Sequence, residues 1–196
     1  MGTMSPIKNR KKLEAMKKYF LGKNEIRNYA LFCVGINTAL RISDILNLKW
    51  KDVYDFDRRR FKKHLELTEK KTHKKNMIFL NKGALYALEK LMKHYKLENV
   101  KISAEHYIFL GRKSVNKPLS RSQAYRIIKE ASQILKIEGN IGCHSLRKTF
   151  GYFAALCKVS SIMIMNIYNH SSFSITKRYL GIDQDERDRV FMKVAL

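Results

Sequence analysis

The stretch "GCHSLRKTFGYF", from Gly142 to Phe153, combines a histidine and an arginine three positions apart at the predicted start of a helix. Apolar residues at spacings of four, three and four give that helix one buried face: Leu146, Phe150, Phe153 and Cys157. His144 and Arg147 are about one helical turn apart and project from the same side. Taken alone, the pair is better explained by an ordinary helix start and a solvated arginine, so its meaning depends on the rest of the chain.

The charge of the chain points to a polyanionic partner. Its 196 residues carry 40 Lys and Arg against 17 Asp and Glu, a formal net charge of +23. The basic residues recur from Lys8 to Lys193 rather than in one tail. A folded domain with this balance repels itself unless a polyanion neutralises it. Nucleic acid is the first candidate and an anionic membrane surface the second, while an ordinary basic surface is the simplest alternative.

Length and composition fit a folded domain in the cytoplasm. A chain of 196 residues suits one domain, or at most two small ones, and its 45% hydrophobic content supports a core. Cys33, Cys143 and Cys157 form no CxxC pair and indicate reduced thiols. The sequence has no apolar run of membrane-spanning length, and its basic N-terminus lacks the apolar segment of a signal peptide. A cytoplasmic protein with no membrane partner is therefore expected.

The predicted elements are mostly helices, with one small sheet. Helices are predicted over residues 8–20, 24–37, 43–48 and 174–182, and from Asn81, Ser120, Gly142 and Ser160 or Ser161. Asn24 and Asn81 are the expected caps, and Ser120 with Gln123 fits a capping box. Three strands are predicted over residues 50–57, 61–68 and 77–80. The expected architecture is an α+β, mainly α-helical fold with a small antiparallel three-stranded sheet, in a single domain of residues 1–196.

Four further polar residues have ordinary explanations when each is taken alone. Arg41 would be a surface arginine at a helix N-terminus, a place that the helix macrodipole makes unfavourable unless an anion binds there. Lys71 would be a solvated lysine at the tip of a hairpin. His170 would be a turn residue, and Tyr179, nine positions later, a core aromatic.

The six residues together suit phosphoryl transfer. Two arginines from distant segments can grip a phosphodiester and stabilise the charge that builds on it. Imidazoles can donate to a phosphoryl oxygen or move a proton, and a lysine can protonate a leaving alkoxide. A tyrosine, whose pKa is about 10, can form a covalent phosphoryl intermediate if it is helped to deprotonate. No carboxylate cluster or His/Cys ligand set is evident, so neither a metal nor another cofactor is expected.

The order of these segments resembles the catalytic domain of the tyrosine recombinases, also called the phage integrase family. "NTALRISDILNLKWKDV" is similar to the first arginine segment, and "EKKTHKKNMIFL" to the hairpin segment that carries the family's lysine. "HSLRKTF" matches the HxxR box, and "IYNHSSFSITKRYLGI" matches the closing box. Each box alone is weak, whereas the complete order over about residues 24–182 is specific.

The resemblance implies how the phosphate would be bound. Arg41 and Arg147 would clamp the scissile phosphate, and His170 would donate to a non-bridging oxygen.

It also implies how protons and the covalent bond would move. Tyr179 would attack to form a 3′-phosphotyrosyl link, and His144 would assist phosphate binding and proton transfer from the tyrosine. Lys71 would be the general acid for the 5′ leaving oxygen. The 5′ hydroxyl of another strand would then complete the exchange.

The sequence departs from the family pattern in four places. Ala39 stands where the family often has glycine, Tyr168–Asn169 replaces the common Leu-Gly, and Thr72–His73 lies where glycine is frequent. Only some 23 residues precede Asn24, too few for the N-terminal core-binding domain that most members carry. The expectation is therefore a catalytic domain without the core-binding domain, as a minimal recombinase or a fragment.

The function expected from this resemblance is site-specific recombination of double-stranded DNA through a 3′-phosphotyrosine, with no small-molecule substrate. The protein would be nucleoid-associated, a monomer when free and a tetramer on synapsed DNA. Two alternatives stay open: a non-catalytic DNA-binding accessory protein of the same fold, and a nicking-closing enzyme like the type IB topoisomerases. The tail after residue 182 would either dock on a neighbouring protomer or pack on its own domain.

Overall fold

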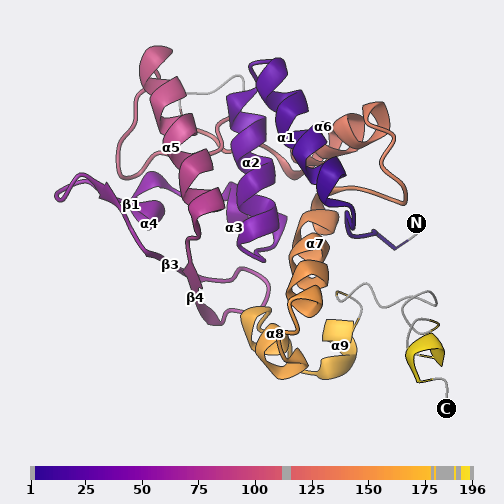
Figure 1. Ribbon diagram of the computed structural model, residues 1–196. Helices are drawn as coiled ribbons and strands as arrows, with labels where there is room; N and C mark the ends of the chain where they lie inside the picture. The colour runs from indigo at the N-terminus through magenta and orange to yellow at the C-terminus, as the bar shows by residue number, and fades with distance from the viewer. Residues whose placement is uncertain (1–2, 112–115, 178, 180–187, 189–190, 195–196) are drawn as a thin grey trace.

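The computed structural model describes residues 3–111, 116–177, 179, 188 and 191–194 (Figure 1). Its helices are α1 (Arg10–Gly22), α2 (Ile26–Asn37), α3 (Ile42–Leu46), α4 (Trp50–Val53), α5 (Lys82–Leu97), α6 (Arg121–Ile134), α7 (Cys143–Leu156), α8 (Ser161–Ile167) and α9 (Phe173–Lys177). Its strands are β1 (Tyr54–Asp55), β2 (Arg60–Phe61), β3 (His64–Thr68) and β4 (Lys75–Phe79). The predicted α+β, mainly helical architecture is confirmed.

Helix α2 is the centre of the main core. It is apolar around nearly its whole circumference, which is typical of a buried helix, and it packs against α1, α5 and α7 (Figure 1). The prediction that Asn24 caps this helix is wrong. Asn24 has a φ of 53°, outside the conformation of an N-cap, and the helix begins at Ile26 after Glu25.

The caps predicted for two later helices are confirmed. The side chain of Asn81 accepts a hydrogen bond from the Ala84 amide at 3.0 Å at the start of α5. At the start of α6, the Gln123 amide donates to Ser120 Oγ at 3.2 Å, and the Ser120 amide donates to Gln123 Oε1 at 3.2 Å. These contacts are local in sequence, which is why the residue pattern alone reveals them.

The predicted three-stranded sheet is instead two hairpins. Strand β1 pairs with β2, and β3 pairs with β4, each antiparallel. Residues 50–53 form helix α4 rather than the start of a strand, because Trp50 and Val53 are both buried at helical spacing and the Lys49 amide donates to Asp52 Oδ2 at 2.7 Å. The hydrogen bond from the Lys62 amide to the Val53 carbonyl at 2.8 Å extends the β1–β2 hairpin, and only residues 62 and 63 separate β2 from β3.

Helix α7 runs from the main core to α8 (Figure 1), where Ala39, Ile164 and Tyr168 form a smaller second core. The close packing of α7 on α2 depends on Gly35, since a Cβ there would lie 2.5 Å from Leu146 Cδ1. The N-terminal arm also packs on α7: Ile7 is buried, and its amide donates to Thr149 Oγ1 at 2.9 Å. Leu146 directly precedes Arg147, so this packing fixes the position of the arginine.

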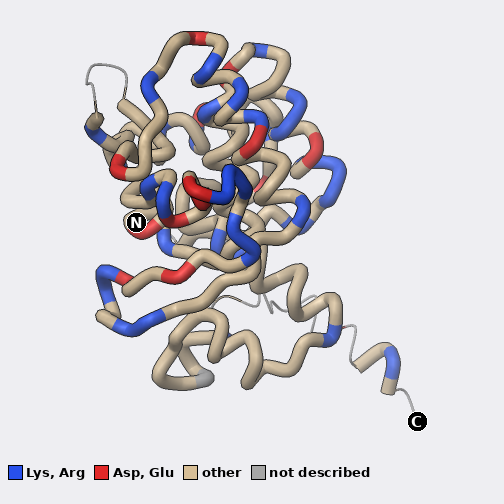
Figure 2. Tube along the Cα trace, turned by 90° about the vertical axis from the view of Figure 1, so that its left-hand side faces the viewer, with Lys and Arg blue, Asp and Glu red and all other residues tan. Residues whose placement is uncertain are grey.

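Basic residues are spread over the main helical body, whereas the part of the chain around α8 carries few charges (Figure 2). In the described residues, none of the helices has the length and apolarity needed to cross a bilayer. Of the C-terminal tail, residues 188 and 191–194 are described, and Phe191, Met192 and Val194 are exposed. The remainder of the tail prediction lies outside the described residues.

Candidate active site

Arg41 is placed by a tight turn between α2 and α3. Ala39 has a φ of 56°, the left-handed conformation that glycine adopts more easily, and this turn directs the chain into Arg41 at the N-terminus of α3. The Arg41 side chain is 15% exposed and forms an ion pair with Glu69, which is fully buried. Arg41 therefore lies at the boundary between the interior and the surface.

Arg147 is buried in α7 and connects the first arginine turn to the closing segment. Its Nη1 donates to the Ala39 carbonyl, and its Nη2 donates to the Tyr168 carbonyl at 2.8 Å. In the described part of the chain, its Nε has no hydrogen-bond partner. A buried donor without a partner is rare in folded proteins, and in this cationic setting it suits an incoming anion.

The Tyr179 ring lies between the two predicted histidines. Ring centroids are 5.0 Å apart for Tyr179 and His144 and 4.7 Å apart for Tyr179 and His170. The ring also lies 5.6 Å from the guanidinium carbon of Arg147. Residues that are far apart in sequence thus surround the predicted nucleophile.

The environment keeps both imidazoles neutral near pH 7. Protein atoms packed around the ring, followed by the charges of Lys148 and the two arginines, lower the pKa of His144 from 6.5 to about 4, although part of its side chain is exposed to the groove. Burial and the same two arginines lower the pKa of His170 to about 4. Neutral imidazoles can accept a proton, which is the form that a partner of a tyrosine nucleophile needs.

The hydrogen bonds of His170 define its tautomer. Arg147 can only donate, so His170 Nε2, at 3.5 Å from Arg147 Nη2, is the acceptor. The ring proton then lies on Nδ1 and is donated to Thr176 Oγ1 at 3.0 Å. Thr176 is fully buried, so this side of the ring is fixed from the interior.

A groove of about 1320 Å³ brings four of the six predicted residues together: Arg41, Lys71, His144 and Tyr179. Lys71 reaches it from the loop between β3 and β4 and is exposed. Arg147 and His170 do not line the groove and contact Tyr179 from the interior. Helix α6 contributes Arg121, Tyr125 and Arg126 to the groove, which makes its wall more basic.

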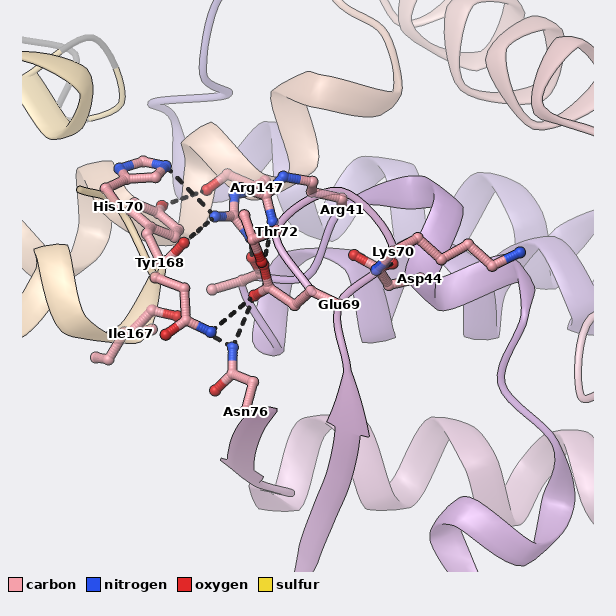
Figure 3. Close-up of polar contacts among 12 residues, drawn as sticks. Arg41, Asp44, Glu69, Lys70, Thr72, Asn76, Arg147, Ile167, Tyr168 and His170 are labelled. Carbon is pink, nitrogen blue, oxygen red and sulfur yellow. Dashed lines mark hydrogen bonds and ion pairs between the residues drawn. The ribbon is translucent and has the colours of Figure 1, made fainter. Parts of the chain in front are cut away.

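Two buried carboxylates were missed by sequence reasoning. Glu69 contacts Arg41, and Asp44 accepts a hydrogen bond from the Lys70 amide at 3.1 Å (Figure 3). Burial raises the pKa of Asp44, and its Oδ2 has no partner in the described part of the chain. The available sequence signal was an acid three positions after Arg41 and another beside the lysine run.

Tyr168 packs against the site from the protein interior and does not provide a second nucleophile. It is fully buried, and its hydroxyl donates to the Arg147 carbonyl at 2.6 Å. Burial raises its pKa, so its hydroxyl resists deprotonation. Its ring lies 4.3 Å from the Arg147 guanidinium carbon and 5.0 Å from the Tyr179 ring. A Cβ at Gly151 would come within 2.4 Å of the Tyr168 hydroxyl, so the glycine makes room for this tyrosine.

Among the described residues, no three His, Cys, Asp or Glu side chains gather in a way that could hold a metal ion.

Comparison with known proteins identifies a single family along most of the chain. The model of the phage integrase family matches residues 8–186. "Probable integrase/recombinase YoeC" of Bacillus subtilis (strain 168) is 44% identical over 185 residues, covering 94% of this chain and 93% of that protein. "Tyrosine recombinase XerH" of Campylobacter jejuni is 24% identical over 189 residues, and the chain spans 49% of its length.

Solved structures show the same fold. The XerA recombinase structure has a TM-score of 0.77 at 18% identity and covers 100% of this chain and 67% of its own. The XerH recombinase in a post-cleavage complex with a palindromic difH substrate has a TM-score of 0.75 at 18% identity, covering 97% of this chain and 53% of its own.

Proposed function

The chain belongs to the phage integrase family, and from that premise we propose that it is a tyrosine-type site-specific DNA recombinase. It cleaves and rejoins DNA strands through a 3′-phosphotyrosine. The observation that carries the proposal is the position of Tyr179, which lies against two neutral imidazoles and on the same groove as Arg41 and Lys71. Such an arrangement suits attack on a phosphodiester better than simple DNA binding.

In the cleavage step, Tyr179 Oη attacks the scissile phosphorus and the bond from phosphorus to the 5′ oxygen breaks. The tyrosine proton passes to neutral His144, and Lys71 supplies a proton to the leaving 5′ oxygen. Arg41 and Arg147 neutralise the charge that builds on the phosphoryl oxygens. The phosphotyrosyl bond conserves the energy of the broken bond, so no cofactor is required.

For Arg147 and His170 to reach the phosphate, the Tyr179 ring must turn away from them as DNA enters. His170 can then donate to a non-bridging oxygen only if Nε2 gains a proton. A bound phosphodiester favours this, since a nearby negative charge raises the pKa of an imidazole. In the rejoining step, a 5′ hydroxyl from another strand attacks the phosphotyrosine and releases Tyr179.

The proposed partner is double-stranded DNA, in keeping with the net charge of +23 and the basic wall of the groove. XerH recombinase has been solved in complex with its DNA substrate, which supports this choice by family relationship. We expect a monomer in free solution, a tetramer on synapsed DNA and a cytoplasmic, nucleoid-associated location.

The test is incubation with supercoiled plasmid and nicked duplex that carry the DNA flanking the gene. The expected result is a covalent adduct, mapped by mass spectrometry to Tyr179, together with recombinant product. Relaxation without recombinants would indicate a nicking-closing enzyme. A mobility shift without any adduct would indicate a non-catalytic accessory protein.

A further inference from the structure

We propose that Glu69 is a positioning residue that holds Arg41 from the interior and fixes the Lys71 loop and the His170 segment relative to it. This inference rests on the proposed function, because Arg41, Lys71 and His170 are the groups that it would position.

Glu69 accepts hydrogen bonds from four residues in three segments of the chain (Figure 3). Its Oε2 accepts from Arg41 and from Thr72 Oγ1, the latter at 2.9 Å. Its Oε1 accepts from Asn76 Nδ2 at 2.9 Å and from Asn169 Nδ2 at 3.3 Å. The side chain is fully buried, so no water competes for these contacts. One carboxylate thus joins the first arginine turn, the hairpin and the closing segment.

The carboxylate lies behind Arg41 and not in the path of a phosphate. Arg41 lines the groove and is 15% exposed, whereas Glu69 is fully buried and does not line it. A guanidinium has five N–H donors, so Arg41 can bind Glu69 on one side and a phosphate on the other. Long side chains lose rotamer freedom when they are ordered, and Glu69 imposes this order before DNA arrives.

Glu69 is ionised in the folded protein. Burial alone would raise its pKa, but hydrogen bonds from Asn76 and Thr72 and the charge of Arg41 outweigh it and lower the pKa below the ordinary value. A buried ion pair tolerates the loss of one partner poorly, because the other charge remains without compensation. Replacing this charge should therefore disturb Arg41 directly.

The loop that carries Lys71 closes on Glu69. The Glu69 amide donates to the Lys74 carbonyl at 3.0 Å, and the His73 amide donates to the Glu69 carbonyl at 2.9 Å. Together with the bond from Thr72, these contacts fix both ends of the segment around Lys71. The backbone around Lys71 is thereby fixed, and its exposed side chain reaches the groove.

Asn169 makes the connection to His170. It has a φ of 52°, which glycine or asparagine adopts more easily than other residues, and glycine is common here in the family pattern. Glycine would satisfy the backbone but would leave Glu69 without this donor. The asparagine therefore serves both the turn and the carboxylate.

The experiment compares cleavage of three nicked substrates by the full chain and by Glu69→Gln. The substrates carry an ordinary scissile phosphodiester, a 5′-bridging phosphorothiolate or an uncharged methylphosphonate. Glu66→Gln, at an exposed position of β3, is the matched control and should cleave like the wild type.

For Glu69→Gln, we expect cleavage of the ordinary substrate to fall about 100-fold, the scale of a misplaced catalytic group. The sulfur leaving group should restore part of this loss, because it removes the need for Lys71 but not for Arg41. On the methylphosphonate, the cleavage rates of Glu69→Gln and the wild type should differ less, because this substrate carries less negative charge for Arg41 to stabilise. Wild-type cleavage by Glu69→Gln would overturn the proposal, and faster cleavage would show that Glu69 blocks the phosphate.

Asn169→Gly provides a second variant that keeps the charge of Glu69 and suits the backbone. It should lose less activity than Glu69→Gln, and the double variant should lose no more than Glu69→Gln alone. Losses that multiply would mean that the two side chains act independently, which contradicts the proposal.

A readout without DNA separates this proposal from the recombinase proposal. The NMR signals of the Arg41 guanidinium should be protected from exchange in the wild type and in Glu66→Gln, and unprotected in Glu69→Gln. If the wild type forms no adduct on any substrate, the recombinase proposal fails. If the Arg41 signals are unchanged in Glu69→Gln, the positioning role fails.

Discussion

At the scale of single residues, the two arginines of the site are held in different ways. Arg147 donates to two backbone carbonyls, which fix its orientation without cancelling its charge. Arg41 is balanced by the carboxylate of Glu69. Before DNA binds, the positive charge of Arg147, next to the ring of Tyr179, is therefore less compensated than that of Arg41. We therefore expect substitutions of Arg41 and of Arg147 to have different effects on DNA cleavage.

Tyr179→Phe should bind DNA but form no covalent adduct, because the variant lacks the hydroxyl that attacks phosphorus. Stability should change little, since the variant loses only that group. Denaturing gels of nicked-substrate reactions check the adduct, and mobility shifts check binding. An adduct that persists and maps to Tyr168 would contradict the assignment of the nucleophile.

Lys71→Ala should cleave ordinary DNA about 10²–10⁴-fold more slowly, the usual contribution of a general acid. A 5′-bridging phosphorothiolate should restore nearly the wild-type rate, because a sulfur leaving group needs no proton. Arg147→Ala should not be rescued in this way, because it loses charge stabilisation at the phosphoryl oxygens. Selective rescue of Lys70→Ala or Lys74→Ala instead of Lys71→Ala would move the acid to another position in the loop.

At the scale of elements, the contact between α2 and α7 determines the position of the arginine in the HxxR box. Gly35 allows Leu146 to pack directly on the α2 backbone, and Arg147 follows immediately in the chain. The turn after α2 supplies the Ala39 carbonyl that Arg147 binds. Packing of one helix pair thus positions both arginine segments.

Gly35→Ala should lower the free energy of unfolding by about 1–3 kcal/mol, because its Cβ would lie 2.5 Å from Leu146 Cδ1 and overpack the contact. Gly22→Ala, at the end of α1, is the control, since nothing lies within 4 Å of its Cβ. The control should be neutral or up to about 1 kcal/mol more stable. Urea unfolding measures both, and equal effects would rule out the packing explanation.

At the scale of the whole molecule, the site is a cationic cluster built where the two hydrophobic cores meet. The main core supplies the elements around Arg41, and the second core includes Tyr168 and packs against Tyr179. Partial removal from water and the surrounding cations depress the pKa of both site histidines. The stability of the DNA-free protein should therefore depend on pH in a defined window.

Stability should fall as the pH drops from about 6.5 to about 4. In this window the unfolded chain binds protons at His144 and His170, whereas the folded protein, with a pKa of about 4 for each, does not. Above about 6.5 both states are neutral at these sites, and the contribution is fully present. Thermal melting across this range should show a shallower pH dependence for His144→Gln than for the wild type. Equal slopes would mean that the His144 pKa is not depressed.

The sequence by itself determined what depends on neighbours in the chain. The caps at Asn81 and Ser120 and the family of the chain follow from local patterns. These features need only residues three or four positions apart, or motifs in a given order. The buried face predicted for the HxxR helix is only partly right: Leu146 is buried, Phe150 and Phe153 are half-buried, and Cys157 is exposed, because α7 extends beyond the main core at its C-terminal end. The catalytic roles of the six predicted residues stay predictions, although the fold brings the other five to the same site as Tyr179.

Only the tertiary structure decided the contacts that hold the site. Residues 50–53 became a helix because Trp50 and Val53 are buried together in the main core, against the strand prediction. Glu69 connects the segments of the site only in the folded chain, because its partners Arg41 and Asn169 lie 28 and 100 positions away in sequence. In the sequence, an isolated acid in a basic loop has the pattern of a solvated residue. It needs hydrogen-bond partners within the protein only because the fold buries it. No local pattern carries that information, because the energy of a buried charge depends on which distant segments fold around it.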